Sequence, residues 1–289
     1  MKKILFTANL VAVVLLCAQS HLVADFDYQT YVQSFNAANG NRGITIEYSH
    51  NGSPLLNEAE IWLKNSTPGN TFADTSAYQS DGMLPQGGSD YFATFCISRT
   101  NTVVFGETSQ GKLNYEGNRT LTRDEISVTV GAAWLYKLFA TGEINTVFAG
   151  YNQDGEPMYS YGNLVEREAN ARRFQQALMM LIGVDMTTPW SNNNYTFALM
   201  EYASRELGLT GLAAQQYWTR AYNLNGENEL MGNYTVFSMY TAEGSFLYLA
   251  PHAGGSSSDV PEPGTLLIWT LSSIGVAGVS WARKRRSKT

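Results

Sequence analysis

Cysteine and histidine are almost absent from this chain of 289 residues, which has two of the first and three of the second. Clustered His and Cys ligands for a metal ion are therefore missing. The sequence also contains no G-x-S-x-G nucleophile elbow and no glycine-rich phosphate loop. The residues that enzymes commonly use for catalysis are therefore scarce, so we predict a protein that is not an enzyme and has no metal and no cofactor.

Positive charge is scarce in the middle of the chain. The whole sequence has 19 Lys and Arg against 25 Asp and Glu. The first 24 residues hold two of the cations, and the tail after Val260 holds five cations and Glu262, which leaves 12 cations and 24 acids in residues 25–260. A net charge of −12 repels phosphate backbones, and no basic stripe with interleaved aromatics is present. We predict that nucleic acid is not a partner.

The N-terminus has two lysines followed by an apolar run over residues 4–18. This pattern is typical of a secretory signal, and the run is too short for a convincing membrane span. We predict a signal peptide over residues 1–24. Cys17 lies inside it, and the alternative of a lipidated cysteine is disfavoured by the bulky Leu16 before it. Export leaves Cys96 as the only cysteine, which excludes a disulfide within the mature monomer.

The C-terminus has the features of a membrane anchor. Residues 265–282 carry no charge, and a helix of that length reaches about 27 Å, close to the roughly 30 Å of a hydrocarbon core. A basic cluster follows at once, formed by Arg283, Lys284, Arg285 and Arg286. Because such clusters stay cytoplasmic, we predict a transmembrane helix over 265–282, a cytoplasmic tail over 283–289, and an exported N-terminal bulk.

A spacer over residues 251–264 precedes the predicted helix. It contains a Gly/Ser stretch, typical of flexible linkers, and a proline-rich motif that cannot form regular pairing. The motif consists of Val260, Pro261, Glu262, Pro263 and Gly264. Residues 260–286 closely resemble the PEP-CTERM sorting signals of Gram-negative bacteria that make extracellular polysaccharide. The resemblance implies membrane insertion, recognition and processing by an exosortase, and transfer to the cell surface or the extracellular matrix.

The exported region, residues 25–250, reads as a single domain. Alternating or apolar runs predict strands over 43–50 and 91–98, the second forming a hairpin with 102–107, while residues 57–90 read mostly as loop. Helical patterns follow within 123–143, 165–183, 195–207 and 212–223, and two strands end the domain at 234–242 and 245–251. Strands that flank a central helical block predict an α+β fold, with the C-terminal transmembrane helix added.

Two short motifs single out Cys96 and Gln175. Phe95-Cys96-Ile97 and, 79 residues later, Gln175-Gln176-Ala177-Leu178 resemble the paired motifs of bacterial thioester (TQXA) adhesin domains. The resemblance implies an internal Cys96–Gln175 thioester. It departs from the family in Phe174 before the glutamine and in Met179, where the family has Trp.

A thioester of this kind would be attacked by an amine or hydroxyl on a protein or polysaccharide, giving covalent adhesion. The residues alone leave other interpretations open, because free cysteine is among the most buried residue types and often only fills space. A disulfide between two chains is another. The alternative function is a non-covalent structural or carbohydrate-binding component of the polysaccharide matrix, and a glycosidase using paired carboxylates is a third.

Overall fold

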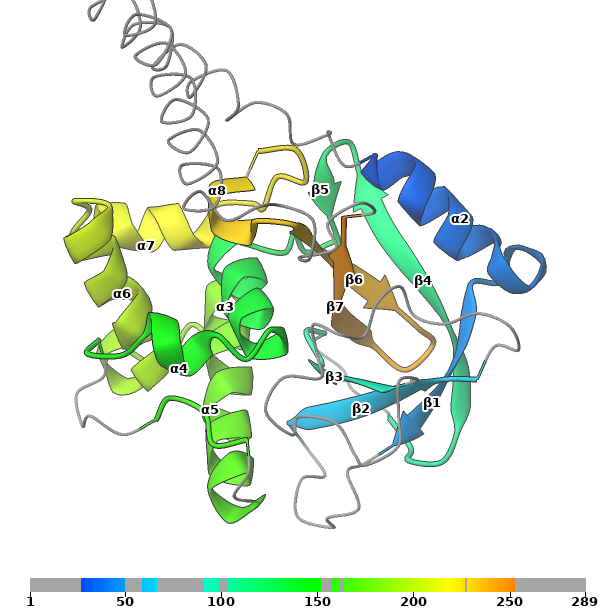
Figure 1. Ribbon diagram of the computed structural model, residues 1–289, viewed down its shortest axis with the longest axis horizontal. Helices are drawn as coiled ribbons and strands as arrows, with labels where there is room; N and C mark the ends of the chain where they lie inside the picture. Colours follow the sequence, from blue (N-terminus) through cyan, green and yellow to red (C-terminus); the bar gives the residue numbers. More distant parts are fainter. Residues whose placement is uncertain are drawn as a thin grey trace, which may run out of the picture. The chain divides into compact units, whose positions relative to one another are not determined.

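The computed structural model describes most of the chain between residues 27 and 252 (Figure 1). The described residues are 27–49, 59–66, 91–98, 103–151, 157–161, 164–226 and 228–252. The predicted signal peptide, sorting motif, transmembrane helix and basic tail lie outside them. No helix within the described ranges is both long and apolar enough to cross a membrane.

The fold is α+β, as predicted, and its sheet forms a nearly closed six-stranded antiparallel barrel. The order of strands around the barrel is β3-β2-β1-β4-β6-β7, and a two-residue strand, β5, pairs with the end of β4. The strands are β1 (Ile44–Ser49), β2 (Glu60–Asn65), β3 (Tyr91–Phe95), β4 (Thr108–Glu116), β5 (Arg119–Thr120), β6 (Tyr234–Tyr240) and β7 (Ser245–Pro251). The first and last of the six barrel strands meet only at a short seam.

Cys96 forms this seam. It follows β3 directly and makes an antiparallel bridge to Phe246 on β7. The amide of Ile97 donates to the carbonyl of Ser245 at 2.7 Å, and the Thr94 hydroxyl donates to the carbonyl of Leu247 at 2.5 Å. These bonds satisfy backbone groups that would otherwise be exposed at two strand edges. The closure of the barrel therefore fixes the backbone position of Cys96.

The described helices lie between β5 and β6 in the chain, except for α2, which packs against β1 and β4 (Figure 1). They are α2 (Tyr28–Asn41), α3 (Val130–Ala140), α4 (Ile144–Val147), α5 (Leu164–Leu181), α6 (Asn194–Glu206), α7 (Gly211–Thr219) and α8 (Asn228–Met231), with a 3-10 turn at Trp190–Asn192. All eleven residues of α3 are buried, because α3 packs against β6 and β7 as well as α5 and α7. A helix that is almost entirely apolar belongs in the core, and its one charged residue, Lys137, is paired with Glu143.

The helix predicted within residues 165–183 is confirmed as α5, and one of its faces is apolar. Phe174, Ala177, Leu178 and Leu181 are all buried. The ring of Phe174 packs against Phe95 at the end of β3, with a centroid separation of 4.6 Å. This apolar face thus packs α5 against the strand that precedes Cys96.

Three predictions of local structure were wrong or incomplete. Residues 57–90, predicted mostly as loop, contain β2. Its short apolar run is flanked by polar sequence, so the pattern did not indicate a strand. The predicted hairpin does not form, because β3 pairs with β2 and residues 103–107 make a turn, with Gly106 at φ +84°, before β4 begins. No sequence pattern predicted α2, which Asp27 caps by accepting the amide of Thr30 at 3.0 Å.

A buried ion pair connects β2 to α5. The guanidinium of Arg167 donates to both carboxylate oxygens of Glu60, at 2.6 and 3.0 Å, and both side chains are at most 3 % exposed. Trp62 and Tyr159 donate to the same carboxylate at 2.7 and 2.5 Å. Burial opposes the charge on Arg167, but Glu60 outweighs it and raises the pKa of the guanidinium. Burial, followed by the nearby Glu60 charge, raises the pKa of Tyr159 well above its usual value.

We predict that Arg167→Ala lowers the free energy of unfolding by about 3–5 kcal/mol, because it leaves the Glu60 carboxylate buried without its counter-charge. Arg172→Ala on the same helix is the matched control. Its partner is Glu168, its side chain is 62 % exposed, and its loss should cost at most about 0.5 kcal/mol. Chemical denaturation followed by circular dichroism measures both. Equal effects for the two variants would contradict a structural role for the buried pair.

Candidate functional site

The Cys96 thiol is buried at the barrel seam. Cys96 is 4 % exposed and forms no disulfide. Its sulfur lies 3.1 Å from the hydroxyl oxygen of Ser98. Burial raises the pKa of the thiol, and the hydrogen bond to Ser98 offsets part of that rise. The group is therefore a protonated thiol at neutral pH. Its burial disfavours the alternative of a disulfide to another chain.

Gln175 reaches the same place from α5. Its side-chain nitrogen donates to the backbone carbonyl of Cys96, so the structure brings the two predicted residues together across 79 positions of sequence. Its side-chain oxygen is buried and has no hydrogen-bond partner among the described residues. A buried acceptor without a partner costs free energy and is rare in folded proteins. The carboxamide is thus held beside the seam with its carbonyl unsatisfied.

A serine and a glycine missed by the sequence analysis complete the site. The amide of Ser245 donates to the Ser98 hydroxyl oxygen at 3.2 Å. Gly244 closes the other side, where an added Cβ would lie 2.9 Å from that oxygen and 3.3 Å from the Cys96 sulfur. The sequence does carry a signal for Ser98: it lies two residues after Cys96, and residues two apart in an extended chain share a face. Gly244 gave none, since its role depends on a contact between distant strands.

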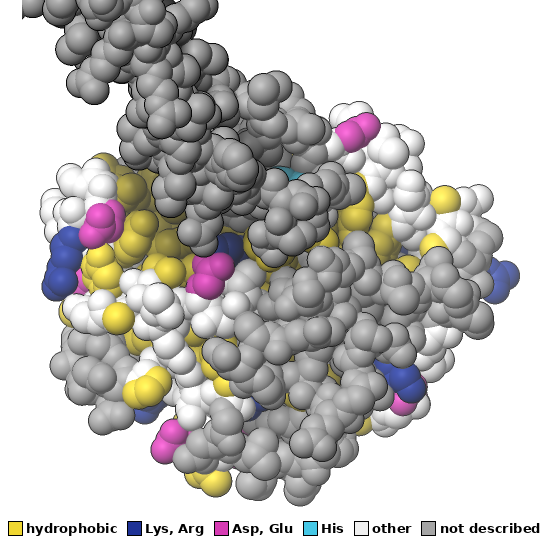
Figure 2. All heavy atoms as spheres, in the orientation of Figure 1, with side chains coloured by type: hydrophobic (Ala, Val, Ile, Leu, Met, Phe, Trp, Pro, Cys, Tyr) yellow, Lys and Arg dark blue, Asp and Glu magenta, His cyan; other side chains and the backbone are white. Residues whose placement is uncertain are grey.

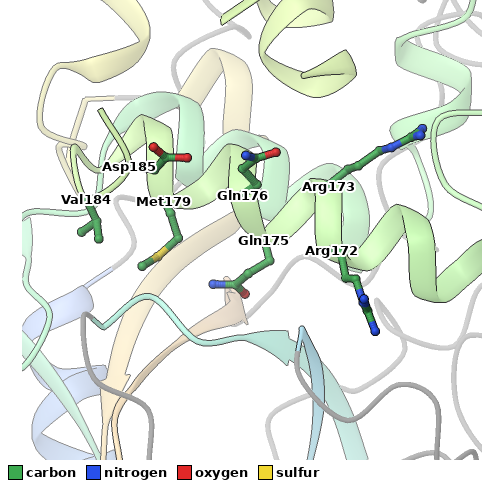
Figure 3. A pocket seen from close by; sticks show the side chains of 7 residues that line it. All are labelled: Arg172, Arg173, Gln175, Gln176, Met179, Val184 and Asp185. Carbon is green, nitrogen blue, oxygen red and sulfur yellow. The ribbon is translucent and has the colours of Figure 1, made fainter. Parts of the chain in front are cut away.

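The surface beside Gln175 is an open depression of about 490 Å³ (Figure 3). Its lining residues are Arg172, Arg173, Gln175, Gln176, Met179, Val184 and Asp185. Figure 3 shows Gln175 pointing toward the strands, while Gln176 and Asp185 point to the other side of the helix. Because the polar groups do not converge, the depression does not look like a site for a small ligand. It does give solvent a route to the neighbourhood of Gln175.

On the face shown in Figure 2, the acidic and basic side chains are scattered, and no patch of a single charge forms among those drawn in colour. Within the described ranges, no group of three or more His, Cys, Asp and Glu side chains is placed to hold a metal ion. What the site offers chemically is a buried thiol, a carboxamide and a hydroxyl. Acyl transfer from a carboxamide to sulfur needs these groups, with the thiol first losing its proton to become the nucleophilic thiolate.

Comparison of the chain with known protein families, curated proteins and solved structures found no match. The two resemblances described above therefore rest on their short motifs.

We predict that Gly244→Ala lowers the free energy of unfolding by about 1–3 kcal/mol, because its methyl group crowds the Ser98 hydroxyl and the Cys96 sulfur. Adding Ser98→Ala removes the nearest clashing atom and should restore part of the loss. A double-mutant cycle by chemical denaturation measures this coupling. Strictly additive effects would show that the methyl group at position 244 and the Ser98 hydroxyl do not share one packed space.

Proposed function

We propose that this is an exported surface or matrix protein whose domain forms an internal thioester between Cys96 and Gln175 and uses it for covalent adhesion. The observation that carries the proposal is the Gln175 carboxamide, which is hydrogen-bonded to the backbone of Cys96 while its own oxygen is buried and unpartnered. Residues that only filled space would not require a polar group to be buried in this way.

Formation of the thioester balances without any co-reactant. The Cys96 sulfur attacks the carboxamide carbon of Gln175, a carbon–sulfur bond forms and the carbon–nitrogen bond breaks. The thiol proton leaves with the nitrogen as ammonia. A thioester oxygen is a weaker hydrogen-bond acceptor than an amide oxygen, so the reaction lowers the cost of leaving that oxygen without a partner. The hydrogen bond from the carboxamide to the Cys96 backbone holds Gln175 beside the residue that carries the nucleophile, which favours the step.

The stored acyl group reacts once. A lysine amine or a sugar hydroxyl on a target attacks the carbonyl carbon, forms an amide or an ester, and returns Cys96 as a free thiol. The open depression beside Gln175 provides an approach for such a nucleophile. No turnover follows, so the protein acts as a single-use covalent binder rather than an enzyme.

Export and sorting complete the proposal and rest on the chain termini. The signal peptide would direct the domain across the inner membrane, and the helix over 265–282 would anchor it there. An exosortase would then process the chain near Pro261-Glu262-Pro263 and pass the domain to the cell surface or the polysaccharide matrix. The basic cluster Arg283–Arg286 would hold the tail on the cytoplasmic side.

The alternative, a non-covalent structural or carbohydrate-binding matrix component, needs aromatic rings on the surface. Many of the large aromatic side chains are fully buried instead. They include Tyr48, Tyr136, Tyr159, Tyr195, Tyr248, Phe92, Phe95 and Trp218. Since buried rings cannot stack on sugars, these residues lend the alternative no support.

We predict that the purified domain is lighter than its sequence by one ammonia and resists thiol alkylation. Cys96→Ala and Gln175→Glu should both abolish the deficit, because either the nucleophile or the leaving nitrogen is gone. Gln176→Glu is the matched control: its carboxamide is bonded to Thr188 at 3.0 Å instead of facing the seam, so it should keep the deficit. Intact mass spectrometry decides, and a wild-type domain of full mass with a reactive thiol would overturn the proposal.

For sorting, we predict that Pro261→Ala combined with Glu262→Ala keeps the full-length chain in the inner membrane of a host that has an exosortase. The wild type should lose its tail and appear at the surface. Ser256→Ala, in the spacer, should be processed normally. Cell fractionation with immunoblotting measures the distribution, and unchanged processing of the double variant would contradict recognition of the motif.

A further inference from the structure

The Ser98 hydroxyl is hydrogen-bonded to the proposed reacting atom, the Cys96 sulfur. The hydroxyl oxygen lies 3.1 Å from the Cys96 sulfur, and Ser98 is only 6 % exposed. The Ser245 amide donates to that oxygen and so holds it in place against the sulfur. Gly244 leaves the room for this contact, because any Cβ there would intrude on both atoms.

The direction of the hydrogen bond between Ser98 and Cys96 depends on the state of the sulfur. In the resting thiol either atom can donate to the other. Once the sulfur carries negative charge it has no proton, and only the serine hydroxyl can donate. A hydrogen bond to a charged acceptor is roughly twice as strong as one between neutral groups. The contact therefore strengthens at the moment when the sulfur becomes a thiolate.

We propose that Ser98 is a catalytic residue of the thioester, donating a hydrogen bond to the Cys96 sulfur whenever charge develops on it. This inference rests on the proposed thioester. In ring closure, Ser98 stabilises the thiolate that attacks Gln175, and the thiol proton ends on the departing ammonia. In ring opening, the carbon–sulfur bond breaks, the electron pair goes to sulfur under the Ser98 hydroxyl, and the surplus proton of the attacking amine ends on the thiol.

A purely structural role for Ser98 predicts different effects of its removal. If the Ser98 hydroxyl only filled space under Gly244, its removal would change the stability of the fold and leave the reactivity of the sulfur unchanged. If it acts on charge, its removal changes rates and the titration of the thiol. The two roles are thus separable by measuring reactivity and stability on the same variants.

The first measurement is the rate of ring opening by methylamine, followed by intact mass. We expect Ser98→Ala to open about tenfold more slowly than wild type, the effect of losing one charge-assisted hydrogen bond. Ser98→Thr keeps the hydroxyl and should recover most of the rate. Equal rates in wild type and Ser98→Ala would overturn the role of Ser98 while the thioester itself stands. A wild type without the ammonia deficit would overturn both.

The second measurement does not need the thioester. In a Gln175→Ala background the Cys96 thiol stays free, and its alkylation is followed as a function of pH. Ser98→Ala should move the midpoint to higher pH, because the Ser98 hydrogen bond lowers the pKa of the thiol. The charged groups near the sulfur are the same in both variants. Asp124 raises the pKa of the thiol, Glu243 accepts a hydrogen bond from Tyr48, and the guanidinium of Arg123 donates to the carbonyl of Ala242. An unchanged midpoint would overturn the proposal.

Discussion

The buried ion pair between Glu60 and Arg167 is the constraint on which the arrangement of the site depends. Apolar surfaces can slide over one another at small cost, but a carboxylate that accepts two bonds from one guanidinium permits a single geometry. The pair therefore sets where α5 lies along β2. Gln175 follows Arg167 by eight residues on the same helix, about 12 Å further along its axis. Fixing one end of α5 against the barrel in this way delivers the carboxamide to the seam.

The other half of the arrangement comes from the barrel. Closure of an antiparallel sheet removes its exposed edges, and here the two edges join through Cys96 and Phe246. The bonds that Thr94 and Ile97 make to β7 on either side of Cys96 fix the position of its backbone. The same closure excludes water from the thiol and raises its pKa. The site thus combines a sulfur positioned by strand pairing with a carboxamide positioned by a helix, each held by a separate interaction.

Sequence reasoning succeeded where local patterns carry the information. The helix that contains Phe174, the buried strand before Cys96, and the central helical block followed by two strands all follow from periodicity and composition. It failed where distant segments decide. β2 is a strand because β1 and β3 flank it, and the expected hairpin is absent because β3 pairs with an earlier strand. The Glu60–Arg167 pair spans 107 positions, and charged residues in a sequence read as solvated surface until a partner is placed beside them.

The topology also fixes when the proposed chemistry could occur. Cys96 meets Gln175 across 79 positions, and the seam needs β7, the final described strand. Contacts so distant in sequence form only when the chain folds as a whole, so the proposed reaction of the thiol with the carboxamide would have to follow folding. On the proposed export route, Cys96 would pass through an oxidising compartment as an exposed thiol before folding, and without a second mature cysteine it would have no intramolecular partner for a disulfide. The scarcity of cysteine thus fits the proposed thioester, which needs the sulfur reduced until the barrel closes around it.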